Sequence, residues 1–246
     1  MASLTGKAAL VTGGSRGIGA AIALRLASEG ASVAFTYSAS GEQANKLVEQ
    51  IAKAGGKAVA IKADAADQEV VRVAVRETAK QFGKIDILVN NAGIIVLGHI
   101  TEIKEADFQR ILSINVHSVF TATQEALYHM PDGGRIIHIG SVNSDRMPFV
   151  GGSVYALTKG AIFSFTKGLA RDLGPRNITV NNIQPGPVDT DGNPASGPFA
   201  ETMLGLMALK RYGKGEEIAG LVSYLAGPEA GYITGASLLI DGGFAA

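Results

Sequence analysis

The first apolar run of the chain, residues 8–11, leads directly into a glycine-rich turn and then into a segment of helical period at residues 20–28. The turn, residues 12–19, reads Thr-Gly-Gly-Ser-Arg-Gly-Ile-Gly. Glycines let a backbone approach a ligand closely, and the start of a helix offers free N–H groups and the positive end of a dipole. A strand, such a turn and a helix in this order predict a pyrophosphate-binding site, although a connection that binds nothing can have the same composition.

Short apolar runs rich in valine, isoleucine and alanine recur along the chain, and stretches of helical period separate them. The runs do not alternate with polar residues, which is typical of strands buried on both faces of a parallel sheet. Strands that alternate with helices predict an α/β fold, a Rossmann-type doubly wound sheet with helices on both faces. No linker-like tract interrupts the 246 residues, so residues 1–246 are predicted to form a single domain. The seven expected strands are residues 8–11, 33–37, 58–62, 85–90, 135–139, 179–184 and 237–240.

The composition excludes several classes of partner and chemistry. Lysine plus arginine and aspartate plus glutamate number 22 each, so no excess positive charge favours binding to nucleic acid or to a membrane surface. The absence of cysteine excludes disulfides, thiolate catalysis and thiolate metal sites. No run approaches the roughly 18 apolar residues of a membrane span and no leader is recognisable, so we expect a cytoplasmic protein. The four histidines lack the spacing of metal ligands, and no metal is expected.

The end of the second expected strand indicates which dinucleotide the turn would bind. An acidic residue there would bind the ribose 2′-hydroxyl of NAD, but residues 35–40 hold no carboxylate and the first one downstream is Glu42. Ser38 can donate a hydrogen bond to a 2′-phosphate, and Arg16 in the turn can pair with it. The sequence therefore predicts NADP(H), with a solvated loop arginine as the alternative reading of Arg16.

Tyr155 and Lys159 are four residues apart in a segment of helical period, residues 153–173, so both side chains lie on one face about a turn apart. Hydride delivery to a ketone creates an alkoxide that needs a proton, and tyrosine, with a pKa of about 10, is a weak donor until its pKa is shifted. A neighbouring ammonium favours the phenolate, so we expect Lys159 to lower the pKa of Tyr155. The pair by itself is common on exposed helices, and its context has to support the interpretation.

That context is a set of motifs in fixed order, and with it the whole chain resembles the short-chain dehydrogenase/reductase family. The motifs are Thr12-Gly13-x-x-x-Gly17-Ile18-Gly19, Asp64 after the third strand, Asn90-Asn91-Ala92-Gly93 after the fourth, Asn115, Ser141 after the fifth, Tyr155-x-x-x-Lys159, and Pro185-Gly186 after the sixth.

The resemblance implies four catalytic residues: Asn115, Ser141, Tyr155 and Lys159. Ser141 would bind the substrate carbonyl, Tyr155 would transfer the proton, and Lys159 would also hold the nicotinamide ribose. Asn115 would order a water that links Lys159 to solvent. The implied cofactor-binding residues are Gly13, Ser15, Arg16, Gly17, Ile18, Gly19, Tyr37, Ser38, Asp64, Ala65, Asn91, Ala92, Gly93, Tyr155, Lys159, Pro185, Gly186, Val188 and Thr190.

Three of these residues also have plain structural interpretations. Ser141 can cap a turn, Asn115 can face solvent in the middle of a helix, and Asp64 can be a helix N-cap. The long stretch without a strand that starts at Pro185 ends near Tyr212, and a loop of this length inside a domain is usually functional. We expect a substrate lid at about residues 187–212.

Three functions are compatible with the sequence. The first is an NADPH-dependent reductase of small ketones, or alcohol dehydrogenase in reverse. The second is a 3-oxoacyl-carrier-protein reductase, although the chain lacks basic residues before the fifth strand, where that subgroup meets its acidic partner. The third is a cyclic-di-GMP-binding regulator on the same scaffold, which is implied by the resemblance of residues 140–148 and 184–191 to a subgroup that contains a cyclic-di-GMP-binding protein. The resemblance also implies a homotetramer or homodimer, and the uncharged residues 242–246 suit burial against a neighbouring subunit.

Overall fold

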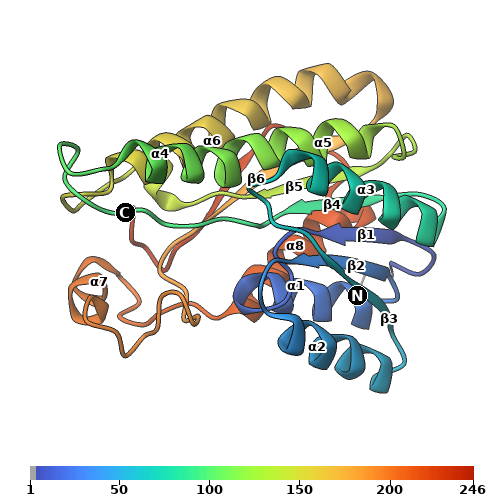
Figure 1. Ribbon diagram of the computed structural model, residues 1–246, viewed down its shortest axis with the longest axis horizontal. Helices are drawn as coiled ribbons and strands as arrows, with labels where there is room; N and C mark the ends of the chain where they lie inside the picture. The colour runs from blue at the N-terminus through green and yellow to red at the C-terminus, as the bar shows by residue number, and fades with distance from the viewer. Residues whose placement is uncertain (1–3) are drawn as a thin grey trace.

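The computed structural model describes residues 4–246. A parallel sheet of seven strands forms the centre of this part of the chain (Figure 1). Its strand order is β3-β2-β1-β4-β5-β6-β7, and every pair of neighbouring strands is parallel. The predicted fold class is confirmed, and the strand boundaries move by at most two residues. The strands are β1 (Ala8–Val11), β2 (Ser32–Tyr37), β3 (Lys57–Lys62), β4 (Ile87–Asn90), β5 (Arg135–Ile139), β6 (Thr179–Pro185) and β7 (Ser237–Ile240).

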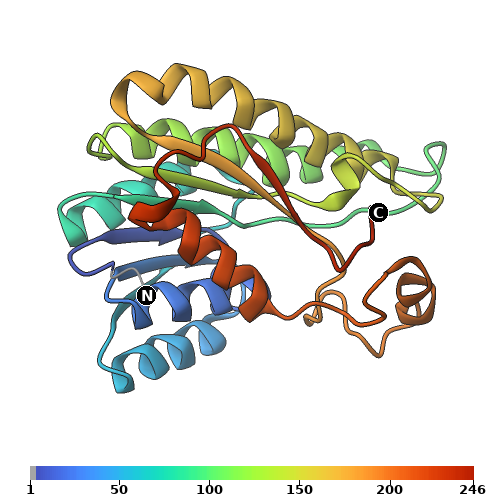
Figure 2. The same cartoon turned by 180° about the vertical axis from the view of Figure 1, so that it is seen from behind.

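Helices cover both faces of the sheet (Figures 1 and 2). One face packs against α1 (Gly17–Ser28), α2 (Gly41–Lys53) and α8 (Gly215–Ala226). The other carries α3 (Gln68–Phe82), α4 (Glu105–Leu112), α5 (Ser118–Leu127) and α6 (Ser153–Leu173). The short helix α7 (Ala200–Leu206) stands apart from both layers. None of the helices in residues 4–246 combines the length and the apolar character that a membrane crossing requires.

The strands have continuous apolar runs because both of their faces are buried. In β1, Ala9 and Val11 belong to the core beneath α1 and α8, whereas Leu10 belongs to the core beneath α3 and α5. Both clusters consist of residues less than a tenth exposed. The pattern that predicted a parallel sheet is therefore a direct consequence of helices on both sides.

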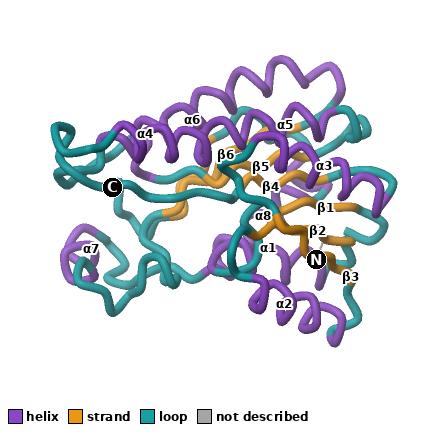
Figure 3. The backbone as a smooth tube through the Cα atoms, in the orientation of Figure 1, coloured by secondary structure: helices purple, strands orange, loops and turns teal. Residues whose placement is uncertain are grey.

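The order of the strands determines where a ligand can bind. The chain builds outward from β1 through β2 to β3, and then returns to place β4 on the other side of β1. The helices that follow β1 and β4 consequently lie on opposite faces of the sheet (Figure 3), and the carboxyl ends of these two strands are where a ligand crevice is expected.

The helix α3 begins at Asp67, whose carboxylate accepts hydrogen bonds from the backbone N–H groups of Glu69 and Val70 at 3.0 and 3.2 Å. The alternative reading of Asp64 as the N-cap is wrong. The side chain of Asp64 accepts a bond from Ala66 N in the loop before the helix, at 3.0 Å. The second carboxylate oxygen of Asp64, Oδ2, lies 3.8 Å from Nη2 of Arg110.

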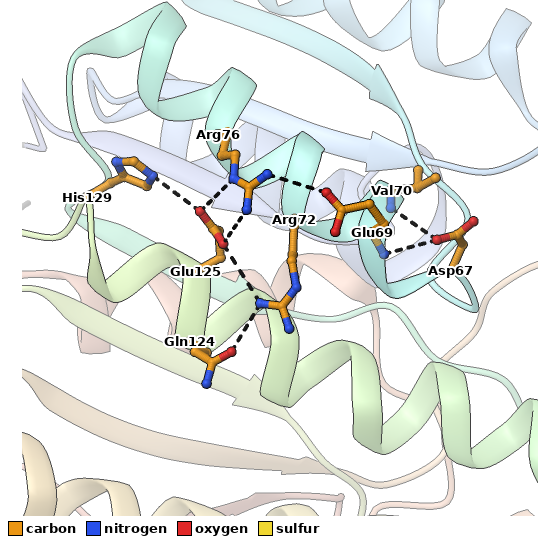
Figure 4. Close-up of polar contacts among 8 residues, drawn as sticks. All are labelled: Asp67, Glu69, Val70, Arg72, Arg76, Gln124, Glu125 and His129. Carbon is orange, nitrogen blue, oxygen red and sulfur yellow. Dashed lines mark hydrogen bonds and ion pairs between the residues drawn. The ribbon is translucent and has the colours of Figure 1, made fainter.

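A cluster of charged residues joins α3 to α5 (Figure 4). The buried carboxylate of Glu125 accepts hydrogen bonds from Arg76 Nε at 2.9 Å and Nη2 at 3.2 Å. Arg72 and His129 lie 3.8 and 3.7 Å from the same carboxylate. The hydrogen bonds from Arg76, together with weaker electrostatic interactions with Arg76, His129 and Arg72, hold the pKa of Glu125 below its usual range.

Glu125→Gln is expected to lower the free energy of unfolding by about 1–3 kcal/mol near neutral pH, because Arg76 loses its charged acceptor. The pKa of Glu125 is lower in the folded chain, so its stabilisation is present above the unfolded value of about 4.3 and disappears as the pH falls through the folded value. Urea unfolding at neutral and acidic pH measures both effects. The exposed Glu49, 3.9 Å from Lys53, is the control, and Glu49→Gln should cost at most about 0.5 kcal/mol. Equal losses in the two variants would contradict the assignment.

Candidate active site

A cleft of about 750 Å³ lies at the carboxyl ends of the central strands. The glycine-rich loop after β1, the ends of β2 and β3, the loop after β4, Ser141 and the start of α6 all border it. Every residue predicted to bind the cofactor lines this cleft, as do Ser141, Tyr155 and Lys159. The structure thus brings together residues that are spread over 178 positions of the sequence, from Gly13 to Thr190, counted inclusively.

Hydrogen bonds from the neighbouring strands hold the glycine-rich loop. Gly13 N donates to Thr36 Oγ1 at 2.9 Å, and Asn91 Nδ2 donates to the carbonyl oxygens of Thr12 and Gly13, both at 2.9 Å. A Cβ atom on Gly19 would lie 2.4 Å from the Gly13 carbonyl oxygen and 2.5 Å from Asn91 Nδ2. Only glycine fits there.

The N-terminus of α1 opens onto this loop. The N-cap residue, Arg16, makes no side-chain capping bond, and the first turn of α1 contains no acidic residue. The positive end of the helix dipole is therefore left uncompensated by the chain itself. A close-fitting glycine loop and free N–H groups at a helix start match a dinucleotide pyrophosphate.

The end of β2 supports the prediction of a 2′-phosphate. Arg16 and Ser38 are both exposed and both line the cleft. Glu42 does not line it and instead pairs with Lys46 at 2.6 Å. Arg16 and Ser38 therefore present a cation and a hydroxyl to the cleft, and the end of β2 itself contributes no carboxylate to it.

Arg110 is a cleft residue that the sequence analysis missed. It comes from α4, and its Nη2 atom lies 3.8 Å from Asp64 Oδ2 on the opposite wall. An isolated arginine on an amphipathic helix carries no motif, so no pattern in the sequence indicates this position. The apolar Ile94 and Ile95, which follow the Asn-Ala-Gly motif, were also missed and line the cleft.

Tyr155 and Ser141 meet at the end of the cleft nearest β5. The helix α6 has the predicted bounds, Ser153–Leu173, and carries Tyr155 and Lys159 one turn apart. Burial raises the pKa of Tyr155, and a hydrogen bond with the Ser141 side chain lowers it in part. The Ser141 hydroxyl also accepts a bond from Asn143 N at 3.1 Å, so Ser141 does cap a turn, as its alternative reading held.

Lys159 is buried beside Tyr155. Its ammonium lies 5.8 Å from the centre of the Tyr155 ring and donates to the carbonyl oxygen of Ile139 at 2.9 Å. Burial lowers the pKa of Lys159 to about 8. A hydrogen bond with Ser141 lowers the pKa of Tyr155 in part. The ammonium of Lys159 is directed to the backbone of β5, and its expected effect on the pKa of Tyr155 stays a prediction.

Asn115 lies in a π-helical turn, Ser113–His117, between α4 and α5. Its side chain is only 2% exposed, so the solvent-facing alternative is wrong. It exchanges hydrogen bonds with the backbone of Ile94, both at 2.9 Å, and donates to Thr158 Oγ1 at 3.1 Å. A Cβ atom on Gly93 would lie 3.4 Å from Asn115 Oδ1 and 3.7 Å from Lys159 Nζ. Asn115 and Lys159 therefore converge on Gly93. Asn115 itself lies in a single π-helical turn, a feature that is frequent at functional sites.

The segment predicted as a lid, residues 187–212, contains the helix α7 and no strand. Val188 and Thr190 at its start line the cleft. Met207 at the end of α7 packs against Val142 and Phe244. Phe244 is thus buried within its own chain, and the expected contact of residues 242–246 with a neighbouring subunit stays a prediction.

Comparison with known proteins gives consistent results across the chain. The family model described as enoyl-(acyl carrier protein) reductase matches residues 13–245. The cyclic-di-GMP-binding biofilm dispersal mediator protein of Escherichia coli K12 is 49% identical over 246 residues, which cover 100% of both chains. A short-chain dehydrogenase/reductase from Serratia marcescens is 62% identical, with a TM-score of 0.98 and 99% of each chain covered. A short-chain dehydrogenase from Burkholderia cenocepacia, solved in complex with NADP, is 51% identical, with a TM-score of 0.97 and the same coverage.

Proposed function

This chain belongs to the short-chain dehydrogenase/reductase family of NADP-dependent oxidoreductases, and from that premise we propose that it reduces the carbonyl group of a small ketone to an alcohol. The observation that carries the proposal is the convergence of three side chains in the cleft: Ser141 and Tyr155 both line it, and the buried ammonium of Lys159 lies 5.8 Å from the centre of the Tyr155 ring. When bound, NADPH supplies the hydride. The chain itself must orient the carbonyl and provide a proton.

Ser141 and Tyr155 divide these tasks. The Ser141 hydroxyl donates a hydrogen bond to the carbonyl oxygen and stabilises the negative charge that develops there. The Tyr155 hydroxyl donates its proton to the same oxygen as the alkoxide forms. Because burial raises the pKa of Tyr155, the side chain stays protonated near neutral pH, which suits a proton donor in the direction of reduction.

Lys159 and Asn115 support the proton transfer. Lys159, with a pKa of about 8, is largely protonated near neutral pH and can replace the proton that Tyr155 gives up. Asn115 holds the loop that carries Ile94 against α6 through Thr158, and so keeps the Lys159 side of the cleft in place.

The walls of the cleft favour an uncharged, apolar ketone. Ile94, Ile95 and Val188 line the cleft, and Ile95 is 55% exposed. Exposed apolar surface at the border of a cleft is suited to contact with the apolar part of a ligand. Asp191 also lines the cleft, and its negative charge would repel an acidic carrier protein that approached the cleft.

Arg16→Ala is expected to lower kcat/KM for NADPH about tenfold or more and to leave the value for NADH within about twofold, because a charge-assisted bond to the 2′-phosphate contributes about 1.5–3 kcal/mol. Initial rates with both cofactors and a panel of aryl ketones and β-keto esters measure this preference. The matched control is Arg171→Ala on α6, an exposed arginine that does not line the cleft. A wild type that oxidises NADH as fast as NADPH would contradict the role of Arg16.

A second candidate function is the binding of cyclic-di-GMP, which the name of the Escherichia coli relative favours. The glycine loop and Arg16, which suit the phosphates of NADPH, also suit the phosphates of cyclic-di-GMP. Calorimetric titration with cyclic-di-GMP separates the two proposals. Micromolar binding together with no turnover over the ketone panel would favour the regulator, and turnover without binding would favour the reductase.

We also infer that the chain assembles into a homotetramer. Phe120 on α5 and Leu157 on α6 are 49% and 53% exposed, and exposed apolar residues on adjacent helices suit a contact with a second copy. Mass determination by light scattering tests this inference.

A further inference from the structure

Residues 241–246, which follow β7, fold back onto the loop after Ser141 and onto the α7 segment. Gly242 and Gly243 both have positive φ values, 61° and 77°, which glycine adopts without strain. The carboxylate of Asp241 accepts bonds from Gly243 N at 3.0 Å and Ala245 N at 2.9 Å. This closed turn fixes the direction of Phe244. The end of the chain lies at the same end of the molecule as α7 (Figures 1 and 2).

The ring of Phe244 fills the space between the loop that follows Ser141 and the α7 segment. It is 1% exposed and clusters with Val142 and Met207, with Met203 and Leu206 packed alongside. Val142 is the residue after Ser141, and Met207 follows α7 directly. One side chain near the end of the chain is therefore in the same small core as the serine loop and the α7 segment.

A polar connection runs in parallel with this packing. The guanidinium of Arg146 donates through Nη1 to the carbonyl oxygen of Phe244 and, at 3.1 Å, to the backbone oxygen of Ala246. It also lies 5.9 Å from the centre of the Phe244 ring. Within the loop, Asn143 Nδ2 donates to the carbonyl oxygen of Arg146 at 2.9 Å, and Asn143 N donates to Ser141 Oγ at 3.1 Å. Hydrogen bonds thus lead from the chain end to the hydroxyl of Ser141.

We propose that residues 241–246 are a positioning element for the active site, in which Phe244 and Arg146 hold the Ser141 hydroxyl and the α7 segment in their working positions. This inference rests on the proposed role of Ser141 in carbonyl reduction. A displacement of about 1 Å at a group that must meet a reacting carbonyl costs up to about 100-fold in rate, so a small loosening of this loop has a large effect. Neither Phe244 nor Arg146 lines the cleft, so both act through other residues.

Phe244→Ala is expected to lower kcat for ketone reduction at least about tenfold while the Kd for NADPH stays within about twofold, because the glycine loop is untouched. Phe244→Leu, which refills the space, should restore most of kcat. Arg146→Gln, which removes the charge but keeps a donor, should give an intermediate loss. The control is Leu47→Ala in α2, which removes a buried side chain from the core on the other side of the sheet and should lower stability without the loss in kcat.

Amide hydrogen exchange provides a measurement that needs no turnover. In Phe244→Ala the peptides covering residues 142–147 and 200–209 should exchange faster by at least about tenfold, while the peptides of β1 and α1 keep their protection. If Phe244→Ala does not fold, Arg146→Gln carries the same two measurements, with Phe244→Leu as the variant expected to stay close to the wild type.

Two outcomes would overturn the positioning role. One is a Phe244→Ala variant that loses kcat no more than Leu47→Ala does, and the other is unchanged exchange in residues 142–147. A wild type that reduces no ketone would instead contradict the proposed function. The exchange measurement would still show whether residues 241–246 stabilise the loop of residues 142–147.

Discussion

Replacing Tyr155 with phenylalanine is expected to lower kcat for ketone reduction by about 10²–10⁴-fold and to leave the Kd for NADPH within about threefold. The ring and its packing stay in place, and only the hydroxyl that gives the proton to the alkoxide is lost. The Ser141 hydroxyl keeps its other partner, Asn143, so the loop around it should not move. Steady-state rates and a fluorescence titration with NADPH measure the two quantities.

The rates of reduction and of oxidation should depend on pH in opposite directions if Tyr155 transfers the proton. Reduction uses protonated Tyr155, whereas oxidation of the alcohol needs the phenolate. Because burial raises the pKa of Tyr155, the rate of oxidation should still be rising above the ordinary tyrosine pKa of about 10, whereas Tyr155 itself does not limit reduction near neutral pH. Tyr232→Phe, at a fully exposed tyrosine, is the control and should change neither profile. Turnover retained in Tyr155→Phe would remove Tyr155 from the mechanism.

Gly19→Ala is expected to weaken NADPH binding by about 10–100-fold and to lower the free energy of unfolding by about 1–3 kcal/mol. The added Cβ atom would lie 2.4 Å from the Gly13 carbonyl oxygen and 2.5 Å from Asn91 Nδ2. Neither atom is free to move, because Asn91 Nδ2 is itself hydrogen-bonded to that oxygen at 2.9 Å. The loop must open to admit the methyl group, and the pyrophosphate cradle opens with it.

The matched control is Gly168→Ala on the exposed side of α6, where an added Cβ atom meets nothing within 4 Å. Alanine is the better helix former, so this variant should gain about 0.5–1 kcal/mol in stability and bind NADPH as the wild type does. Titration with NADPH and urea unfolding of both variants test the comparison. Unchanged binding in Gly19→Ala would mean that the loop is looser than its hydrogen bonds indicate.

The sequence by itself determined the sheet and the location of the cleft. Continuous apolar runs such as residues 8–11 are readable because burial on both faces of a strand leaves no polar alternation. The glycine loop could be predicted because the constraint on it acts within the loop itself. The backbone at Gly19 packs so closely against Gly13 that no side chain fits there. The bounds of α6 were predicted without error, and Tyr155 and Lys159 share one face because helical geometry alone places them there.

Only the tertiary structure decided what these groups do to one another. Lys159 binds the carbonyl oxygen of Ile139, twenty residues before it in the sequence, and Ser141 becomes the partner that lowers the pKa of Tyr155. The contact of Phe244 with the serine loop joins residues about a hundred positions apart. Burial and hydrogen bonding depend on which segments meet in space, and a period or a motif describes only one segment. The Tyr155–Lys159 pair was therefore predictable, whereas the proton affinity of each member of the pair was not.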